Sequence, residues 1–180
     1  MKADELFKSV SLDPLVKQTS FCSGQIDLAD FSRLAPLLLS TDGVVDFSLQ
    51  FMQDDTSRRI VKITIDCGFM LECQRCLQPM CYEVAVTTLL AIVANEEAAE
   101  CLPEGYEPLV LTTNEVILGE VLEDELLLQL PLVAKHGEAE ICRFTIPQAL
   151  QADAPKKTSK KPFATLNTLL RSDKDGSSKE

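Results

Sequence analysis

Two cysteines in a Cys-x-x-Cys spacing, Cys73 and Cys76, are the residues of this chain best suited to do chemistry. A tight turn between cysteines at this spacing directs both thiolates toward one ion, and tetrahedral zinc is commonly held in this way. Zinc then needs two further ligands, which His136 and Cys142 offer, with Cys81 as a competing third ligand. The pattern predicts a zinc site formed by Cys73, Cys76, His136 and Cys142.

Other cysteine chemistry has less support in the sequence. The chain has seven cysteines, an odd number, and cytosolic cysteines are more often buried residues, metal ligands or catalytic groups than disulfides. A redox pair usually begins a helix, whose dipole lowers the thiol pKa, whereas this pair lies between two predicted strands. A cysteine nucleophile would need the single histidine, His136, as its base. No Gly-rich phosphate loop, Walker-type lysine or Gly-x-Ser-x-Gly motif occurs, so we predict no catalytic residue.

Predicted strands place the cysteine pair at the tip of a hairpin. Residues 45–51 alternate cleanly between apolar and polar, residues 60–67 alternate more loosely, and the polar turn between them completes a first hairpin. A further strand over residues 69–72 leads directly into Cys73, and the chain returns as a strand over residues 81–89. The first hairpin is expected to bury one face and to expose the other.

The remaining segments complete an α+β fold class: an antiparallel β-rich domain, a meander or open barrel-like sheet, with one long amphipathic helix and a short N-terminal helix. Strands are expected over residues 17–26 and 106–111, and a short helix over residues 28–38. The long helix is expected over residues 115–130, with acidic residues Glu120, Glu123 and Asp124 on its solvated side. Its apolar stripe comprises Ile117, Leu118, Val121, Leu122, Leu126 and Leu128.

Domain organisation and charge divide the chain at about the same place. Residues 1–150 read as one domain and residues 151–180 as a basic, largely disordered tail with a short amphipathic helix. The chain carries a net charge of −11, of which residues 155–180 contribute +4 and the residues before them −15. An acidic body repels a phosphate backbone and suits a basic protein partner, although charge of this kind also serves solubility.

The chain reads as a cytosolic protein without a membrane segment. Its acidic N-terminus is unlike a signal peptide, and its longest apolar run is far shorter than the roughly 20 residues that a spanning helix needs.

The tail carries the candidate RNA-contacting residues. Residues 155–171 contain no acidic side chain, so they read either as an arm that contacts RNA or a membrane or as a solvated linker. The apolar residues of the patch 163–170 fit a small helix that docks on its own domain. The cations in question are Lys156, Lys157, Lys160, Lys161 and Arg171.

Three stretches of the sequence resemble the YceD-like family, the large ribosomal RNA subunit accumulation proteins. They are the knuckle segment 71–79, the segment 102–108 leading into 121–133, and the tail motif 161–166, in the family's order. The N-terminal 70 residues fit the family only in their pattern of strand, short helix and hairpin.

The resemblance implies a bacterial cytoplasmic ribosome-biogenesis protein needed for normal synthesis, processing or stability of the 23S ribosomal RNA. It implies no enzymatic activity and supplies no catalytic residue. Many relatives place several cysteines after the long helix, where this chain has His136 and Cys142. Two classes of mechanism remain open: a factor that binds a large-subunit ribosomal protein or a pre-ribosomal particle, and an enzyme that processes or modifies rRNA through the cysteine and histidine cluster.

Overall fold

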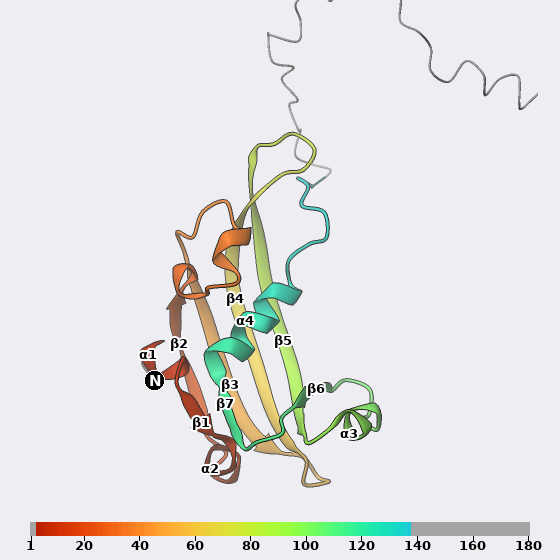
Figure 1. The fold of residues 1–180 in the computed structure, drawn as a ribbon. Coiled ribbons are helices and arrows are strands. Elements are labelled where there is room, and N and C mark those ends of the chain that lie inside the picture. Colours follow the sequence, from red (N-terminus) through yellow and green to blue (C-terminus); the bar gives the residue numbers. More distant parts are fainter. Residues whose placement is uncertain (1–2, 138–180) are drawn as a thin grey trace, which may run out of the picture. The chain divides into compact units, whose positions relative to one another are not determined.

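Alternating apolar and polar residues build the main sheet of this chain, which the computed structural model describes over residues 3–137. The sheet is long, twisted and open, with β2 and β6 as its two edges (Figure 1). Neighbouring strands are antiparallel except β5 and β6, which are parallel. In spatial order the strands are β2 (Phe21–Asp27), β3 (Val44–Gln53), β4 (Arg59–Glu72), β5 (Pro79–Val93) and β6 (Glu107–Val110).

One face of the sheet is buried under α4 (Leu118–Leu128), and the other face is largely solvated. Phe47 on β3 and Ile65 on β4 lie opposite each other and join the core with Leu122 and Leu126 of the helix. Burial of this apolar area from both layers is the main stabilising term of the fold. The α+β class with a mostly antiparallel sheet is confirmed.

The other elements are short and lie around this two-layer core (Figure 1). β1 (Ser9–Ser11) and β7 (Glu115–Ile117) form a separate antiparallel pair directly before α4. The rest are α1 (Ala3–Leu6), α2 (Leu12–Lys17), the 3₁₀ turns η1 (Leu28–Asp30) and η2 (Ala35–Leu37), and α3 (Glu96–Glu100).

Several predicted element boundaries need correction. Residues 60–72 form one continuous strand, because Gly68 stays in the ladder opposite Glu83 and does not end it. The first strand begins at Phe21, and Lys17 instead ends α2. The short helix expected over residues 28–38 takes the form of η1 and η2, and Pro36 lies inside the second turn.

The long helix also differs from its prediction at both ends and on one face. It begins at Leu118 because residues 115–117 pair with β1 instead. Leu128, expected on the buried stripe, is 70% exposed, whereas Glu123, expected in solvent, is only 3% exposed. A buried carboxylate requires hydrogen-bond partners, and these come from outside the helix.

Arg33 and its neighbour supply those partners. The Arg33 and Leu34 backbone amides donate to Glu123 Oε1 at 2.6 and 3.2 Å, and Arg33 Nε donates to Glu123 Oε2 at 2.9 Å. Burial by itself raises the pKa of Glu123, but these hydrogen bonds prevail and lower it below its ordinary value. Glu123 thereby fixes the segment between η1 and η2 against α4.

Glu125 has the opposite electrostatic character. It is 4% exposed, and its Oε2 accepts one hydrogen bond of 2.8 Å from Thr88 Oγ1 on β5. Burial raises its pKa above the ordinary value; the Thr88 bond opposes this effect, and nearby Glu107 and Asp124 add to it. The stability contributions of the two buried glutamates, Glu123 and Glu125, should therefore respond oppositely to pH.

Glu123→Gln is expected to lower the free energy of unfolding by about 1–3 kcal/mol near neutral pH, because it removes charge-assisted hydrogen bonds. Since the folded-state pKa of Glu123 is lowered, its stabilisation is present above the unfolded value and is lost as pH falls. Glu125→Gln should cost little or stabilise near neutral pH, because the raised folded-state pKa makes ionised Glu125 unfavourable there. Both differences from wild type should shrink below about pH 4. Urea unfolding of the wild type and both variants, near neutral pH and below about pH 4, measures these differences in the free energy of unfolding. If Glu125→Gln lowers the free energy of unfolding near neutral pH as much as Glu123→Gln does, the prediction is wrong.

The predicted boundary between residues 150 and 151, and the amphipathic patch 163–170, lie outside the described residues, so the division into domain and tail stays a prediction. Among the helices that the structure describes, none has the length and apolar character needed to cross a bilayer.

Candidate metal centre at the cysteine knuckle

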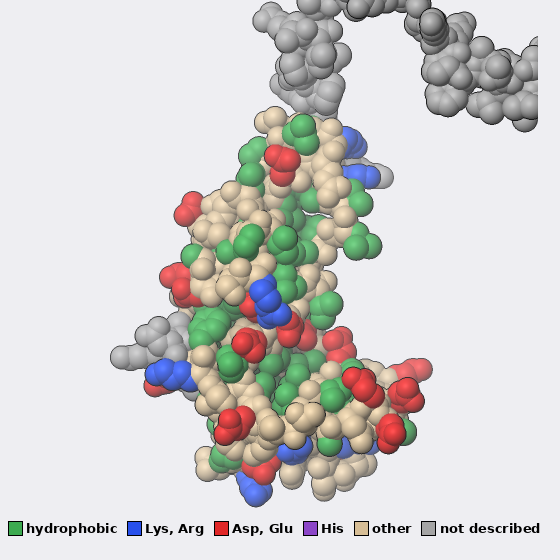
Figure 2. Space-filling view, viewed as in Figure 1, with side chains coloured by type: hydrophobic (Ala, Val, Ile, Leu, Met, Phe, Trp, Pro, Cys, Tyr) green, Lys and Arg blue, Asp and Glu red, His purple; other side chains and the backbone are tan. Residues whose placement is uncertain are grey.

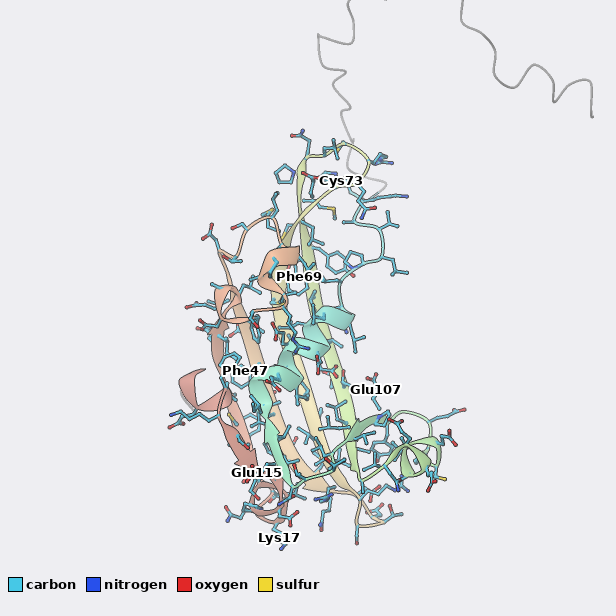
Figure 3. All side chains as sticks on the ribbon, viewed as in Figure 1. Lys17, Phe47, Phe69, Cys73, Glu107 and Glu115 are labelled. Carbon is cyan, nitrogen blue, oxygen red and sulfur yellow. The ribbon has the colours of Figure 1, made fainter. Side chains whose placement is uncertain are left out.

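The Cys73–Cys76 turn joins the ends of β4 and β5, as the sequence predicts. Leu77 N donates to Cys73 O at 2.8 Å, and Cys73 N donates to Gln78 O at 3.0 Å. Leu77 adopts a left-handed backbone with φ of +57°, which is uncommon for a residue with a branched side chain. The tight turn reverses the chain and brings both cysteine side chains to its inner side, where Cys73 is 0% and Cys76 is 6% exposed. Cys73 lies near the far end of the long hairpin (Figure 3).

The segment that follows α4 carries His136 to this turn. Gln74 N in the knuckle donates to Ala134 O at 2.8 Å, which fixes the returning chain beside the two cysteines. Ala134 is itself buried, so the connection combines a backbone hydrogen bond with apolar packing. His136 follows two residues later, and its Nδ1 lies 3.5 Å from Cys76 Sγ.

A backbone carbonyl fixes the orientation of the His136 ring. His136 Nε2 lies 3.2 Å from Pro79 O, and because a carbonyl only accepts, Nε2 carries the proton and donates. In the neutral ring Nδ1 then presents its lone pair toward the cysteines. Metal-bound histidines commonly show this arrangement, in which one nitrogen donates to a carbonyl and the other faces the ion.

The three candidate ligand atoms are close enough together to share one ion. The two sulfurs and one ring nitrogen of Cys73, Cys76 and His136 all lie within 4.8 Å of one another. Around tetrahedral zinc, with bonds of about 2.0–2.3 Å, neighbouring ligand atoms are separated by roughly 3.5–3.8 Å. A small contraction of the cluster would satisfy that geometry, and sulfur with imidazole nitrogen is a donor set that zinc favours.

The environment of Cys73 favours a thiolate, the form that binds metal. Burial raises the pKa of this thiol, but backbone hydrogen bonds from His136, Cys76 and Arg75, together with the Cys76 side chain, lower it to about 5 from an ordinary 9.0. Amides directed at a sulfur are the expected feature of a knuckle that holds a metal-bound cysteine.

The structure brings together three of the four predicted ligands. Cys142, the predicted fourth ligand, lies outside the described residues, so it stays a prediction. Cys81 does not join the cluster: it is exposed, and its Sγ donates to Glu83 Oε1 at 3.3 Å. That hydrogen bond, with a smaller contribution from burial, raises the pKa of Cys81 and keeps it a thiol.

Sequence reasoning missed the backbone groups that assemble the site. Pro79 O orients the histidine, and the bond between Gln74 N and Ala134 O positions the segment that carries it. Main-chain contacts of this kind do not depend on side-chain identity, so the sequence gives no direct signal for them. Pro79, at the end of the knuckle segment, is compatible with a carbonyl that faces inward. The candidate RNA-contacting cations, Lys156, Lys157, Lys160, Lys161 and Arg171, lie outside the described residues.

Comparison with known proteins identifies a family whose match includes this centre. Residues 61–170 match the sequence model of the family described as Large ribosomal RNA subunit accumulation protein YceD. A protein of Haemophilus influenzae with that description is 33% identical over 140 residues, which are 76% of this chain and 80% of that protein. No solved structure matches the chain. The matched region contains most of β4 and all of β5, the knuckle, α4 and His136, and this chain belongs to the YceD family of large ribosomal RNA subunit accumulation proteins.

Proposed function

We propose that this chain is a cytoplasmic, non-enzymatic ribosome-biogenesis factor that supports synthesis, processing or stability of 23S rRNA in the large ribosomal subunit. The family match is the observation that carries the proposal, since the related Haemophilus influenzae protein is named for accumulation of large-subunit ribosomal RNA. The factor acts by binding a large-subunit ribosomal protein or a pre-ribosomal particle, and it contacts 23S rRNA indirectly or through its basic tail.

The charge distribution supports a protein partner for the body of the chain. The residues before 155 carry a net charge of −15, whereas a protein that grips rRNA directly normally presents a basic surface. Two arginines of the described body are held in ion pairs with its own carboxylates: Arg33 with Glu123 and Asp124, and Arg59 with Asp13. These arginines are thereby less available to phosphates.

The cysteine cluster supports a structural role in this proposal. We propose that Cys73, Cys76 and His136 hold one zinc ion, with Cys142 as the fourth ligand. Such an ion would fasten the knuckle to the chain that follows α4, two segments that are far apart in the sequence.

The alternative of an rRNA-processing or rRNA-modifying enzyme would use the same residues as reactive groups. Cys73 is fully buried, and His136 Nε2 is already occupied by Pro79 O. A substrate would have to open the knuckle to reach Cys73. The geometry therefore suits a metal-held turn better than an active site.

Gradient sedimentation of a cell lysate that contains the tagged full chain tests the proposal. The chain should co-migrate with large-subunit precursors and should shift toward the top of the gradient when ribosome assembly intermediates are dissociated. Migration at the top under all conditions, combined with cleavage or modification of 23S rRNA by the pure protein, would overturn the proposal in favour of the enzyme.

A further inference from the structure

Exposed large hydrophobic side chains gather toward the knuckle end of the molecule. Among the described residues, eight such side chains are exposed, and six belong to three segments: η2 and its continuation, the end of α4 with the following loop, and the knuckle. Leu132 is 99% exposed, Leu128 is 70% exposed and Leu37 is 56% exposed. Several exposed apolar side chains at one end of a molecule are a common feature of interaction sites.

A groove joins these segments. It has a volume of about 320 Å³, and Leu37, Leu71, Leu130, Pro131 and Ala134 line it. Glu72 and Gln74 give it a polar rim. The groove has well-defined walls, since Leu39 N donates to Met70 O at 2.7 Å on one side and Gln74 N donates to Ala134 O at 2.8 Å on the other.

Acidic side chains continue from this apolar surface along α4. Glu120, Asp124 and Leu128 are spaced four residues apart, so they follow one ridge of the helix. Glu120 and Asp124 also line a second hollow of about 400 Å³, together with Asp30, Glu123 and Arg33. Figure 2 shows acidic side chains around a single basic group over the middle of α4, with hydrophobic side chains between this region and the knuckle end.

The single cation of this region is not available to a partner's acidic groups. Arg33 Nη1 donates to Asp124 Oδ1 at 2.7 Å, and Arg33 Nε donates to Glu123 Oε2 at 2.9 Å. Hydrogen bonds to Glu123 and Asp124 raise the pKa of Arg33, so its charge is held within the cluster. Among the described residues Glu120 and Asp30 form no ion pair, so the surface presents an apolar groove at one end and net negative charge at the other.

We propose that this surface, defined by Leu37, Leu128, Leu132, Glu120 and Asp30, docks a cationic amphipathic segment of a protein partner. Apolar residues of that segment enter the groove, and its lysine or arginine residues lie along the acidic ridge. The inference rests on the proposed function, because it specifies the chemistry of the ribosomal-protein partner proposed above.

Charge favours a cationic amphipathic segment over two other possible occupants of this surface, RNA and a second copy of this chain. RNA would place phosphates against Glu120 and Asp30 and would offer little apolar area to the leucines. A second copy related by two-fold symmetry would pair like surfaces and would bring two acidic ridges toward the same interface. A cationic amphipathic segment matches the apolar groove with its apolar residues and the acidic ridge with its cations, and complementary charge also speeds association.

Binding of three synthetic peptides to the full chain tests the proposal by fluorescence anisotropy: an amphipathic Leu/Lys peptide, its Leu/Glu counterpart and a Ser/Lys peptide of equal charge. The Leu/Lys peptide should bind most tightly. Leu132→Ser should weaken it by about tenfold or more, as expected for an anchor residue. Glu120→Gln should weaken it by roughly threefold and reduce the salt dependence.

Two matched variants test whether loss of any exposed apolar side chain, or of any negative charge, would weaken peptide binding equally. Phe21→Ser removes another exposed apolar side chain, on the β2 edge, and Glu96→Gln removes an equal charge on α3. Neither should change binding. Equal binding of the Ser/Lys peptide, or equal losses in the control variants, would overturn the proposal.

Two further results would assign the surface to another occupant. Displacement of the Leu/Lys peptide by a 23S rRNA transcript would assign the surface to RNA, and a concentration-dependent dimer abolished by Leu132→Ser would assign it to a second copy.

Sedimentation distinguishes failure of this inference from failure of the proposed function. If wild-type chain co-migrates with large-subunit precursors and Leu132→Ser does so equally, the docking surface is wrong and the proposed function stands. If the wild-type chain fails to co-migrate, the proposed function itself fails.

Discussion

Cys73→Ser is expected to reduce bound zinc from about one ion per chain to background. A serine hydroxyl is a poor zinc ligand, and loss of one thiolate from a tetrahedral site should weaken binding by about 100-fold or more, given the free energy that such sites supply. The substitution also removes the sulfur to which the amides of Arg75, Cys76 and His136 are directed. Elemental analysis of purified protein, with thermal unfolding measured before and after chelation, checks both effects.

Cys81→Ser provides the matched control for this prediction. Cys81 lies on the same hairpin but is exposed and bonded to Glu83, so its replacement should leave the zinc content and the chelator response unchanged. His136→Ala should behave like Cys73→Ser and should also remove one of the contacts that hold the chain after α4 to the knuckle. Zinc-free wild-type protein with reactive Cys73 and Cys76, and no change in melting temperature on adding zinc, would refute the metal site.

The parts of the fold that the sequence predicted well are those in which local pattern and tertiary burial agree. Val45, Phe47 and Leu49 alternate with polar residues, and the structure buries all three on one face of β3. The hairpin-tip position of Cys73 followed from two strand patterns that flank a turn. The contact between Cys76 and His136 was expected from chemistry alone, since the spacing of 60 residues carries no geometric information.

The failures arose where tertiary contacts override local pattern. Helical periodicity placed Leu128 in the core and Glu123 in solvent, but Leu128 is exposed at the last position of α4 and Arg33 pairs with the buried Glu123. Ile117 was the first residue of the predicted apolar stripe, yet its β-branched side chain, like that of Val116, suits the strand that pairs with β1. No local signal shows that residues 9–11 and 115–117 are partners.

Neutralising four tail lysines is expected to remove most direct affinity for rRNA. In this variant Lys156, Lys157, Lys160 and Lys161 are replaced with glutamine. Each phosphate contact contributes about 0.7–0.9 to the slope of log K against log salt, so four contacts should account for a slope of about 3–4. That slope corresponds to a loss on the order of 100-fold between 50 and 200 mM salt in the wild type. Anisotropy with a labelled 23S rRNA transcript at several salt concentrations measures both the affinity and the slope.

A second variant with the same net charge tests whether position matters. Replacing Lys2, Lys8, Lys17 and Lys62 with glutamine also removes four cations, but from the acidic part of the chain. If RNA contact resides in the tail, this control should keep the wild-type slope and lose affinity only through the added long-range repulsion. Equal losses in the two variants would show that net charge alone governs RNA affinity. An unchanged slope in the tail variant would place the phosphate contacts outside these four lysines and would make them part of a solvated linker. Because the acidic body repels phosphate, the loss of slope is expected in the tail variant and not in the control.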